Sequence, residues 1–126
     1  LERLVARLYE ERSRKGLGDF SLTHRMEGFW DKADRAGAQV EIDLVALDEE
    51  SRTIRLGTCK RQGDKLVSDL PRFDQHIAGF RRAVPRFSDW TVERVAIAPT
   101  LNRAQRADIV AAGYQAQDLS DLLEGL

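Results

Sequence analysis

Apolar residues spaced three and four positions apart mark the helical parts of this chain. The longest such stripe runs from Leu66 to the residue before Pro85, and we expect Pro71 to lie in the first turn of that helix. Ser120 is the expected N-cap of a short final helix. The predicted helices cover residues 1–14, 66–84, 101–113 and the segment after Ser120.

Alternating or continuous apolar runs bounded by turn residues predict five strands. The resulting order is αβββαβαβα, in which two helices have the place of crossover connections between parallel strands. We therefore expect an α/β fold with a mixed central sheet flanked by helices, in a single domain over residues 1–126. The predicted strands cover residues 27–33, 40–48, 53–61, 92–98 and 114–119.

Composition narrows the class of protein. Of the 126 residues, 42% are hydrophobic and 33% charged, and no apolar run approaches the length that crosses a membrane. Cys59 is the only cysteine, so an internal disulfide is impossible, and with two histidines a cysteine and histidine zinc site is not expected. A reducing, cytoplasmic setting is expected. Because Leu1 already belongs to an amphipathic pattern, we expect a fragment of a longer protein.

Charge is unevenly distributed along the chain. Residues 60–106 hold ten lysines and arginines against five acidic residues, whereas the remainder holds ten against sixteen. A basic surface beside an acidic pocket would suit a polyanion that meets a metal ion, and a solvated surface explains the same segregation. The candidate phosphate contacts are Arg72, His76, Arg81 and Arg82.

The second and third predicted strands form an acidic hairpin. Closing it around the turn at residues 49–52 places Asp43 opposite Thr58 and Glu41 opposite Lys60. Strict alternation puts these four side chains on one face of the sheet. That face then continues with the apolar residues Val45, Leu47, Ile54 and Leu56.

Two interpretations of the hairpin remain open. In the first, Glu41 and Lys60 form a cross-strand ion pair while Asp43 accepts a hydrogen bond from Thr58, which is ordinary sheet-edge structure. In the second, clustered carboxylates hold Mg²⁺, and the lysine orients a water or stabilises a phosphorane-like transition state.

The same residues resemble a known superfamily. An N-terminal helix, a meander carrying acidic-x-Asp on its second strand and a lysine at the end of its third, and a basic crossover helix resemble the PD-(D/E)XK, restriction-endonuclease-like fold. The stretch GFWDKADRAGAQVEIDLVALDEESRTIRLGTCK is similar to the C-terminal domain of unknown function of archaeal-type P-loop ATPases. The likeness covers nearly the whole chain, and EIDLVALD is its strongest part.

The resemblance implies roles for individual residues. Asp43 matches the central metal-binding aspartate, Lys60 the catalytic lysine, and Glu2 an acidic residue of the first helix. The backbone carbonyl of Cys59 would be a further metal ligand, and Glu41 would support both metal binding and catalysis. The implied cofactor is Mg²⁺, with Mn²⁺ as a substitute, and the implied partners are DNA and the ATPase portion of the same chain.

Thr58 departs from the pattern, because the superfamily has its second acidic ligand at this position. Metal-dependent phosphodiester hydrolysis is therefore expected to be weakened or lost unless Glu41 or Glu2 substitutes. The alternative is a non-catalytic interaction or regulatory module of the ATPase. The sequence contains no P-loop motif, so no ATP site is expected in this chain.

Overall fold

The computed structural model describes residues 1–23, 27–31 and 39–126. Five strands form one sheet in the order β1-β2-β3-β4-β5, the order in which they occur along the chain. The first three pair antiparallel as a meander, whereas β3 with β4 and β4 with β5 pair parallel. The strands are β1 (Glu27–Asp31), β2 (Val40–Asp48), β3 (Thr53–Cys59), β4 (Thr91–Ile97) and β5 (Gln115–Gln117).

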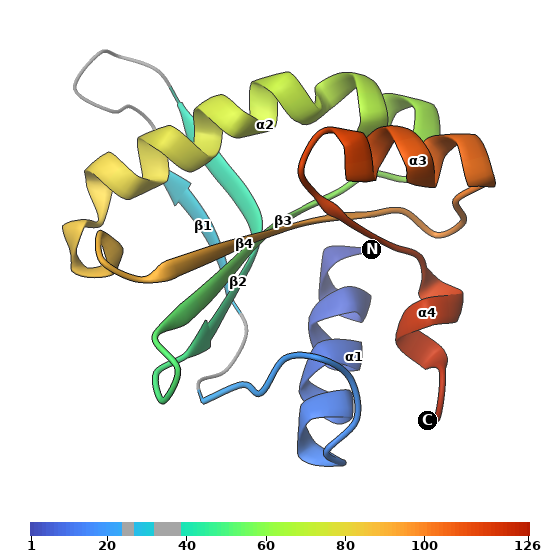
Figure 1. The fold of residues 1–126 in the computed structure, drawn as a ribbon, viewed down its shortest axis with the longest axis horizontal. Coiled ribbons are helices and arrows are strands. Elements are labelled where there is room, and N and C mark those ends of the chain that lie inside the picture. Colours follow the sequence, from blue (N-terminus) through green and yellow to red (C-terminus); the bar gives the residue numbers. More distant parts are fainter. Residues whose placement is uncertain (24–26, 32–38) are drawn as a thin grey trace.

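Helices cover both faces of the sheet, and each face has its own core. Figure 1 shows α2 and α3 on one face and α1 and α4 side by side on the other. The predicted α/β class, mixed sheet and element order are confirmed; residues 32 and 33 of the predicted first strand lie outside the described residues. The helices are α1 (Glu2–Arg14), α2 (Gly63–Ala83), α3 (Arg103–Ala111) and α4 (Leu119–Leu123), with the 3-10 helix η1 (Pro85–Phe87).

Two details of the predicted helices are wrong. Pro71 lies inside α2 and not in its first turn, because α2 already begins at Gly63. The N-cap of α4 is Asp118 and not Ser120, since the Asp118 carboxylate accepts a hydrogen bond from the backbone N–H of Asp121 at 3.0 Å. In turn, the Asp121 carboxylate accepts a hydrogen bond from the backbone N–H of Asp118, and the two bonds together form a capping box.

An extra residue interrupts the pairing of β2 with β1. Glu27 pairs with Val45 and Phe29 with Ile42, so three steps along β2 match two steps along β1. Two residues of β2, beginning with Asp43, therefore oppose a single residue of β1. This is a β-bulge, a device that locally re-aims side chains.

The bulge changes which face of the sheet the residues of β2 occupy. Val40 and Ile42 belong to the core beneath α2, and Val45 and Leu47 pack against the same core although their positions have the opposite parity. Leu44 joins the core beneath α1. The expected strict alternation along β2 is therefore wrong.

Helix α2 lies unusually close to β2 at one position. A Cβ atom added to Gly79 would lie 2.6 Å from Cγ2 of Val40. Only glycine lets the helix backbone approach the sheet this closely without displacing a side chain. Gly79 therefore sets the height of α2 above the sheet.

A buried arginine connects the face under α1 to the neighbouring segments. Arg55 of β3 is 1% exposed and forms ion pairs with Asp19 at 2.9 Å and Glu93 at 2.7 Å. It also donates to the hydroxyl of Tyr9 at 3.1 Å, and its guanidinium lies 4.9 Å from the ring centroid of Phe20. Burial alone would lower the pKa of Arg55, but these partners raise it above its ordinary value.

None of the described helices has the length and apolar character of a membrane-crossing segment.

Candidate functional site

A polar hollow of about 60 Å³ opens between α2 and the ends of β2 and β3. It contains all four polar side chains that the hairpin register brings together. Two further predicted residues, on α2, also line it. The lining consists of Glu41, Asp43, Thr58, Lys60, Asp69, Arg72, Phe73 and His76.

The hairpin register agrees with the prediction. The backbone pairs run from Asp48 with Thr53 to Leu44 with Gly57, and the next step of the same register places Asp43 beside Thr58, to which it is hydrogen-bonded. One Asp43 carboxylate oxygen accepts the Cys59 backbone N–H at 2.8 Å and the Thr58 hydroxyl at 3.4 Å.

Asp43 lies in an electrostatically unfavourable place for a carboxylate. Burial raises its pKa above the ordinary value of 3.8, and the carboxylates of Glu2 and Glu41 raise it further. The Cys59 N–H and the ammonium of Lys60 act in the opposite direction but do not cancel these effects. A cation beside Asp43 would relieve the same repulsion.

Lys60 has a different partner from the one suggested by the hairpin alone. Its Nζ atom lies 3.6 Å from an Asp69 carboxylate oxygen, and among the described residues it makes no ion pair with Glu41. Asp69 was not a predicted site residue. The sequence does place Asp69 on the same helix face as Arg72 and His76, because the three residues are spaced three and four positions apart. It does not show that this face of the helix is turned toward the hairpin.

His76 attaches α2 to the beginning of β2. Its Nδ1 atom accepts a hydrogen bond from the backbone N–H of Glu41 at 3.1 Å. In that arrangement the neutral ring carries its proton on Nε2, which can donate to an oxygen of a ligand. His76 and Arg72 thus add donors to a hollow whose floor is acidic.

Glu2 and Cys59 lie beside the hollow. Glu2 on the first turn of α1 is close enough to raise the pKa of both Asp43 and the Cys59 thiol. Cys59 is 4% exposed and belongs to the core beneath α1, and burial is the main reason for the raised pKa of its thiol. The role of its backbone carbonyl as a metal ligand stays a prediction.

Arg81 and Arg82 do not belong to this hollow. Both are exposed in the last turn of α2, and Arg81 donates to the backbone oxygen of Ser88 at 3.4 Å. Nine residues of helix, or about 13 Å, separate Arg81 from Arg72. The predicted phosphate contacts therefore divide into Arg72 and His76 at the hollow and the two arginines farther along α2.

The fit of the hollow to Mg²⁺ is partial. Asp43 offers a carboxylate, but among the described residues no three histidine, cysteine, aspartate or glutamate side chains gather in an arrangement that could hold a metal ion. Mg²⁺ commonly takes only one or two carboxylates and completes its shell with waters and substrate phosphates. Asp43 could therefore provide one direct ligand, with Glu41 and Glu2 near enough to contribute charge.

The interpretation of this hollow depends on its own geometry and chemistry. Comparison with known proteins identifies no family model, no curated protein and no solved structure that matches the chain.

Proposed function

We propose that this is a restriction-endonuclease-like domain of a P-loop ATPase that associates with nucleic acid. Its metal-dependent phosphodiester hydrolysis is weakened by the threonine at position 58. The observation that carries the proposal is the meeting of Asp43 and Lys60 with Arg72 and His76 in one hollow. Acidic and basic groups placed together in this way suit a phosphate whose charge is shared with a cation.

Each side chain has a task that its position allows. Arg72 and His76 hold a backbone phosphate by donating hydrogen bonds. Lys60 donates to a water or to a phosphate oxygen on which charge develops, while Asp69 keeps the ammonium in the hollow. When bound at Asp43, Mg²⁺ would supply Lewis acidity and lower the pKa of a coordinated water.

Thr58 limits the affinity of the hollow for a metal ion. A hydroxyl has no formal charge, and this one is 2% exposed and already donates to Asp43. Any cation would therefore rely on Asp43, with charge from Glu41 and Glu2. Weak binding follows, because affinity for hard cations depends strongly on the number of charged oxygens.

The test is calorimetric titration of the protein with Mg²⁺ and with Mn²⁺. Saturable binding is expected for the unaltered chain, and Asp43→Ala should abolish it, whereas the exposed Asp108→Ala on α3 should not change it. Thr58→Glu should tighten binding by at least about tenfold, because it restores a charged ligand. Absence of binding in both the unaltered chain and Thr58→Glu, with both folded by circular dichroism, would contradict the proposal.

A non-catalytic interaction module is the second candidate. It is favoured by the hydrogen bonds that Asp43 already receives from Thr58 and Cys59, which make the carboxylate part of the hairpin. In that case neither metal binds, and Asp43→Ala destabilises the fold by losing both bonds. At a working cation site, the same substitution relieves repulsion and stabilises the metal-free protein.

A further inference from the structure

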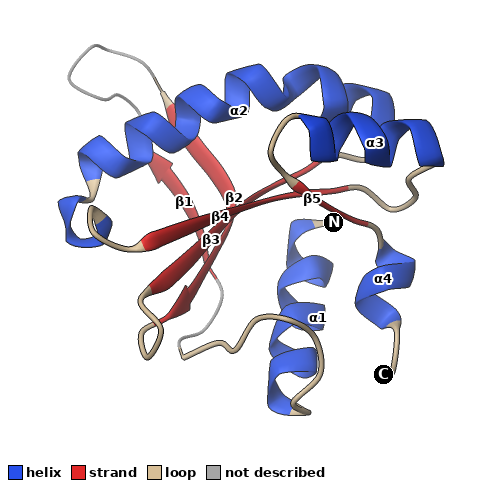
Figure 2. Cartoon of the chain, in the orientation of Figure 1, coloured by secondary structure: helices blue, strands red, loops and turns tan. Residues whose placement is uncertain are grey.

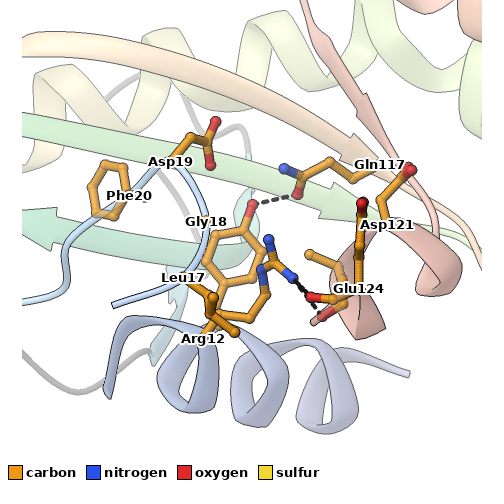
Figure 3. Close-up of a pocket in the computed structure, with 10 residues that line it drawn as sticks. Arg12, Leu17, Gly18, Asp19, Phe20, Gln117, Asp121 and Glu124 are labelled. Atoms are coloured by element: carbon orange, nitrogen blue, oxygen red, sulfur yellow. Dashed lines mark hydrogen bonds between the residues drawn. The ribbon is translucent and has the colours of Figure 1, made fainter. Parts of the chain in front are cut away.

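The acidic hollow differs from the larger cavity of the molecule in how its charged side chains are partnered. The larger cavity, of about 280 Å³, lies between α1, the loop that follows it, and α4. There Asp19 and Asp121 form ion pairs with arginines, and Arg12 donates to the backbone oxygens of Leu122 and Glu124 (Figure 3). These contacts hold parts of the fold together. In the acidic hollow, one cation faces three carboxylates and forms an ion pair with only one of them.

That cation is Lys60, whose partner lies on α2. Asp69 on α2 and Glu41 on β2 both line the hollow with it, and its Nζ atom lies 3.6 Å from the carboxylate of Asp69. The backbone N–H of Glu41 donates to His76, but its carboxylate has neither a hydrogen bond nor an ion pair within the part of the chain that the structure describes. The ion pair that the hairpin alone favours, between Glu41 and Lys60, is therefore absent.

Asp69 is fixed on the side of α2 that faces the strand ends. It lies one turn before Phe73, which is 2% exposed and belongs to the core beneath α2. Asp69 and Lys60 keep 27% and 42% of their side-chain surface exposed, so their ion pair is weak. Because a lysine stem is long and flexible, the ammonium can change partners. Glu41 is the available alternative, since Asp43 already accepts hydrogen bonds from the hairpin.

We propose that Asp69 is a positioning residue for the cation site. By holding the Lys60 ammonium on the α2 side of the hollow, it prevents the cross-strand ion pair and leaves the carboxylate of Glu41 free to act beside Asp43. This inference rests on the proposed function, because it assigns the residue that keeps the acidic floor of the site charged. Asp69 acts through Lys60 and is not itself a ligand of the cation.

The position of this one ammonium changes the charge that a cation meets. With Lys60 beside Asp69, the negative charges of Asp43 and Glu41 both remain, and affinity for hard cations rises with the number of charged oxygens. A Lys60 paired with Glu41 would neutralise one of these charges and bring a like charge closer to the cation. Loss of Asp69 should therefore weaken the site although no ligand is removed.

The movement of Lys60 is measured without metal. The ¹³Cε–¹Hε NMR signal of Lys60 reports the surroundings of its ammonium, and Glu41→Gln is introduced into the unaltered chain and into Asp69→Asn. The change at Glu41 should shift this signal at least about twice as far in Asp69→Asn, because only there do the two side chains pair. Asp108→Asn, on the exposed side of α3, is the control background and should behave like the unaltered chain. An equal or smaller shift in Asp69→Asn would overturn the proposal.

The consequence for the cation is measured by calorimetric titration with Mn²⁺. Asp69→Asn should weaken binding by about two- to fivefold, the contribution of one exposed ion pair. Because this substitution also removes a negative charge near the site, it is repeated in a Lys60→Met background. There it should change the affinity by less than about 1.5-fold, since the ammonium that Asp69 positions is gone. Weakening by the same factor in both backgrounds would mean that Asp69 acts only through its own charge, and would overturn the proposal.

The two proposals can fail separately. If the unaltered chain binds neither Mg²⁺ nor Mn²⁺, the proposed function fails, and the metal-free NMR comparison still decides whether Asp69 keeps Lys60 away from Glu41. If the metal binds but the Lys60 signal responds to Glu41→Gln equally in both backgrounds, the proposed function stands and the role of Asp69 is refuted.

Discussion

At the scale of single residues, Asp43 is a carboxylate that the fold does not stabilise in its charged form. Its pKa is raised, mainly by burial and then by Glu2 and Glu41. In acid below the ordinary value of 3.8, the group is protonated in both the folded and the unfolded chain and costs nothing. As the pH rises through the raised pKa, the folded protein must ionise a disfavoured group, so its free energy of unfolding falls.

Replacing the charge should therefore stabilise the metal-free protein at neutral pH. We expect Asp43→Asn to raise the melting temperature at pH 7, since the amide oxygen still accepts the Cys59 N–H, and to lose this advantage near pH 3. Thermal unfolding followed by circular dichroism at both pH values measures the difference. Asp108→Asn, on an exposed surface, is the control. A lower melting temperature for Asp43→Asn at pH 7 would show that its hydrogen bonds outweigh its desolvation.

The pairing within the hairpin could be predicted from the sequence, but its contacts with α2 could not. The short turn fixes the register from Asp48 and Thr53 onward, and that register brings Asp43 to Thr58. The ion pair of Lys60 with Asp69 depends on the rotation of a helix packed above the strand. Local periodicity shows which side of α2 is apolar but not which polar residues meet the strand ends.

At the scale of elements, the packing of α2 on β2 depends on a residue that disfavours helices. Alanine at position 79 would gain roughly 1 kcal/mol of helix propensity over glycine. Its Cβ would lie 2.6 Å from Cγ2 of Val40, however, and overpacking typically costs 1–3 kcal/mol. The packing cost should exceed the gain, because both backbones are held by regular hydrogen bonds.

We therefore expect Gly79→Ala to destabilise the protein by up to about 2 kcal/mol in urea unfolding, the packing cost less the gain in helix propensity. In a Val40→Ala background the same change should cost less, because the obstructing methyl group is gone. The exposed neighbour Ala78→Gly should cost about 1 kcal/mol through propensity alone. An equal effect of Gly79→Ala in both backgrounds would refute this account of the contact.

The location and type of the elements could be predicted, while their ends and irregularities could not. The apolar stripe of α2 already starts at Leu66, five residues before Pro71, so a helix beginning at the proline conflicts with its own periodicity. Asp118 caps α4 because its carboxylate and that of Asp121 each accept the other residue's backbone N–H, whereas Ser120 lies within the helix. The bulge at Asp43 depends on pairing with β1, which single-strand alternation does not describe.

At the scale of the whole molecule, Arg55 joins segments that are distant in sequence. It lies in β3, and its partners are Tyr9 on α1, Asp19 in the following loop and Glu93 on β4. With only 1% of the residue exposed, water cannot replace these partners. Removing Arg55 would leave Asp19 and Glu93 compensated only by the solvent that reaches them.

We expect Arg55→Met to lower the free energy of unfolding by on the order of 3 kcal/mol, the lower end for buried pairs, because Asp19 and Glu93 retain some solvent. Arg52→Met is the matched control: Arg52 pairs with Asp89 at 3.0 Å, but the two side chains are 62% and 61% exposed. It should cost less than about 1 kcal/mol. Urea unfolding of both variants provides the comparison. Similar losses of unfolding free energy in the two variants would mean that the buried Arg55 network stabilises the fold no more than an exposed ion pair does.

The alternation of strands and helices after β3 predicted the mixed sheet correctly, because two parallel pairings require crossovers. The position of α1 beside α4 was not predictable in the same way, since the two helices are at opposite ends of the sequence (Figures 1 and 2). Their contact creates the larger cavity, and no motif marks it in advance.

The order of the strands in the sheet also bears on how the chain acquires its structure during synthesis. Each strand pairs with the strand made immediately before it, so the sheet can extend as the chain leaves the ribosome. Helix α1 is different, because Val5, Leu8 and Tyr9 share a core with Ile97 and Leu122. Helix α1 therefore completes its burial only when β4 and α4 have been made, and until then its apolar face is accessible to chaperones.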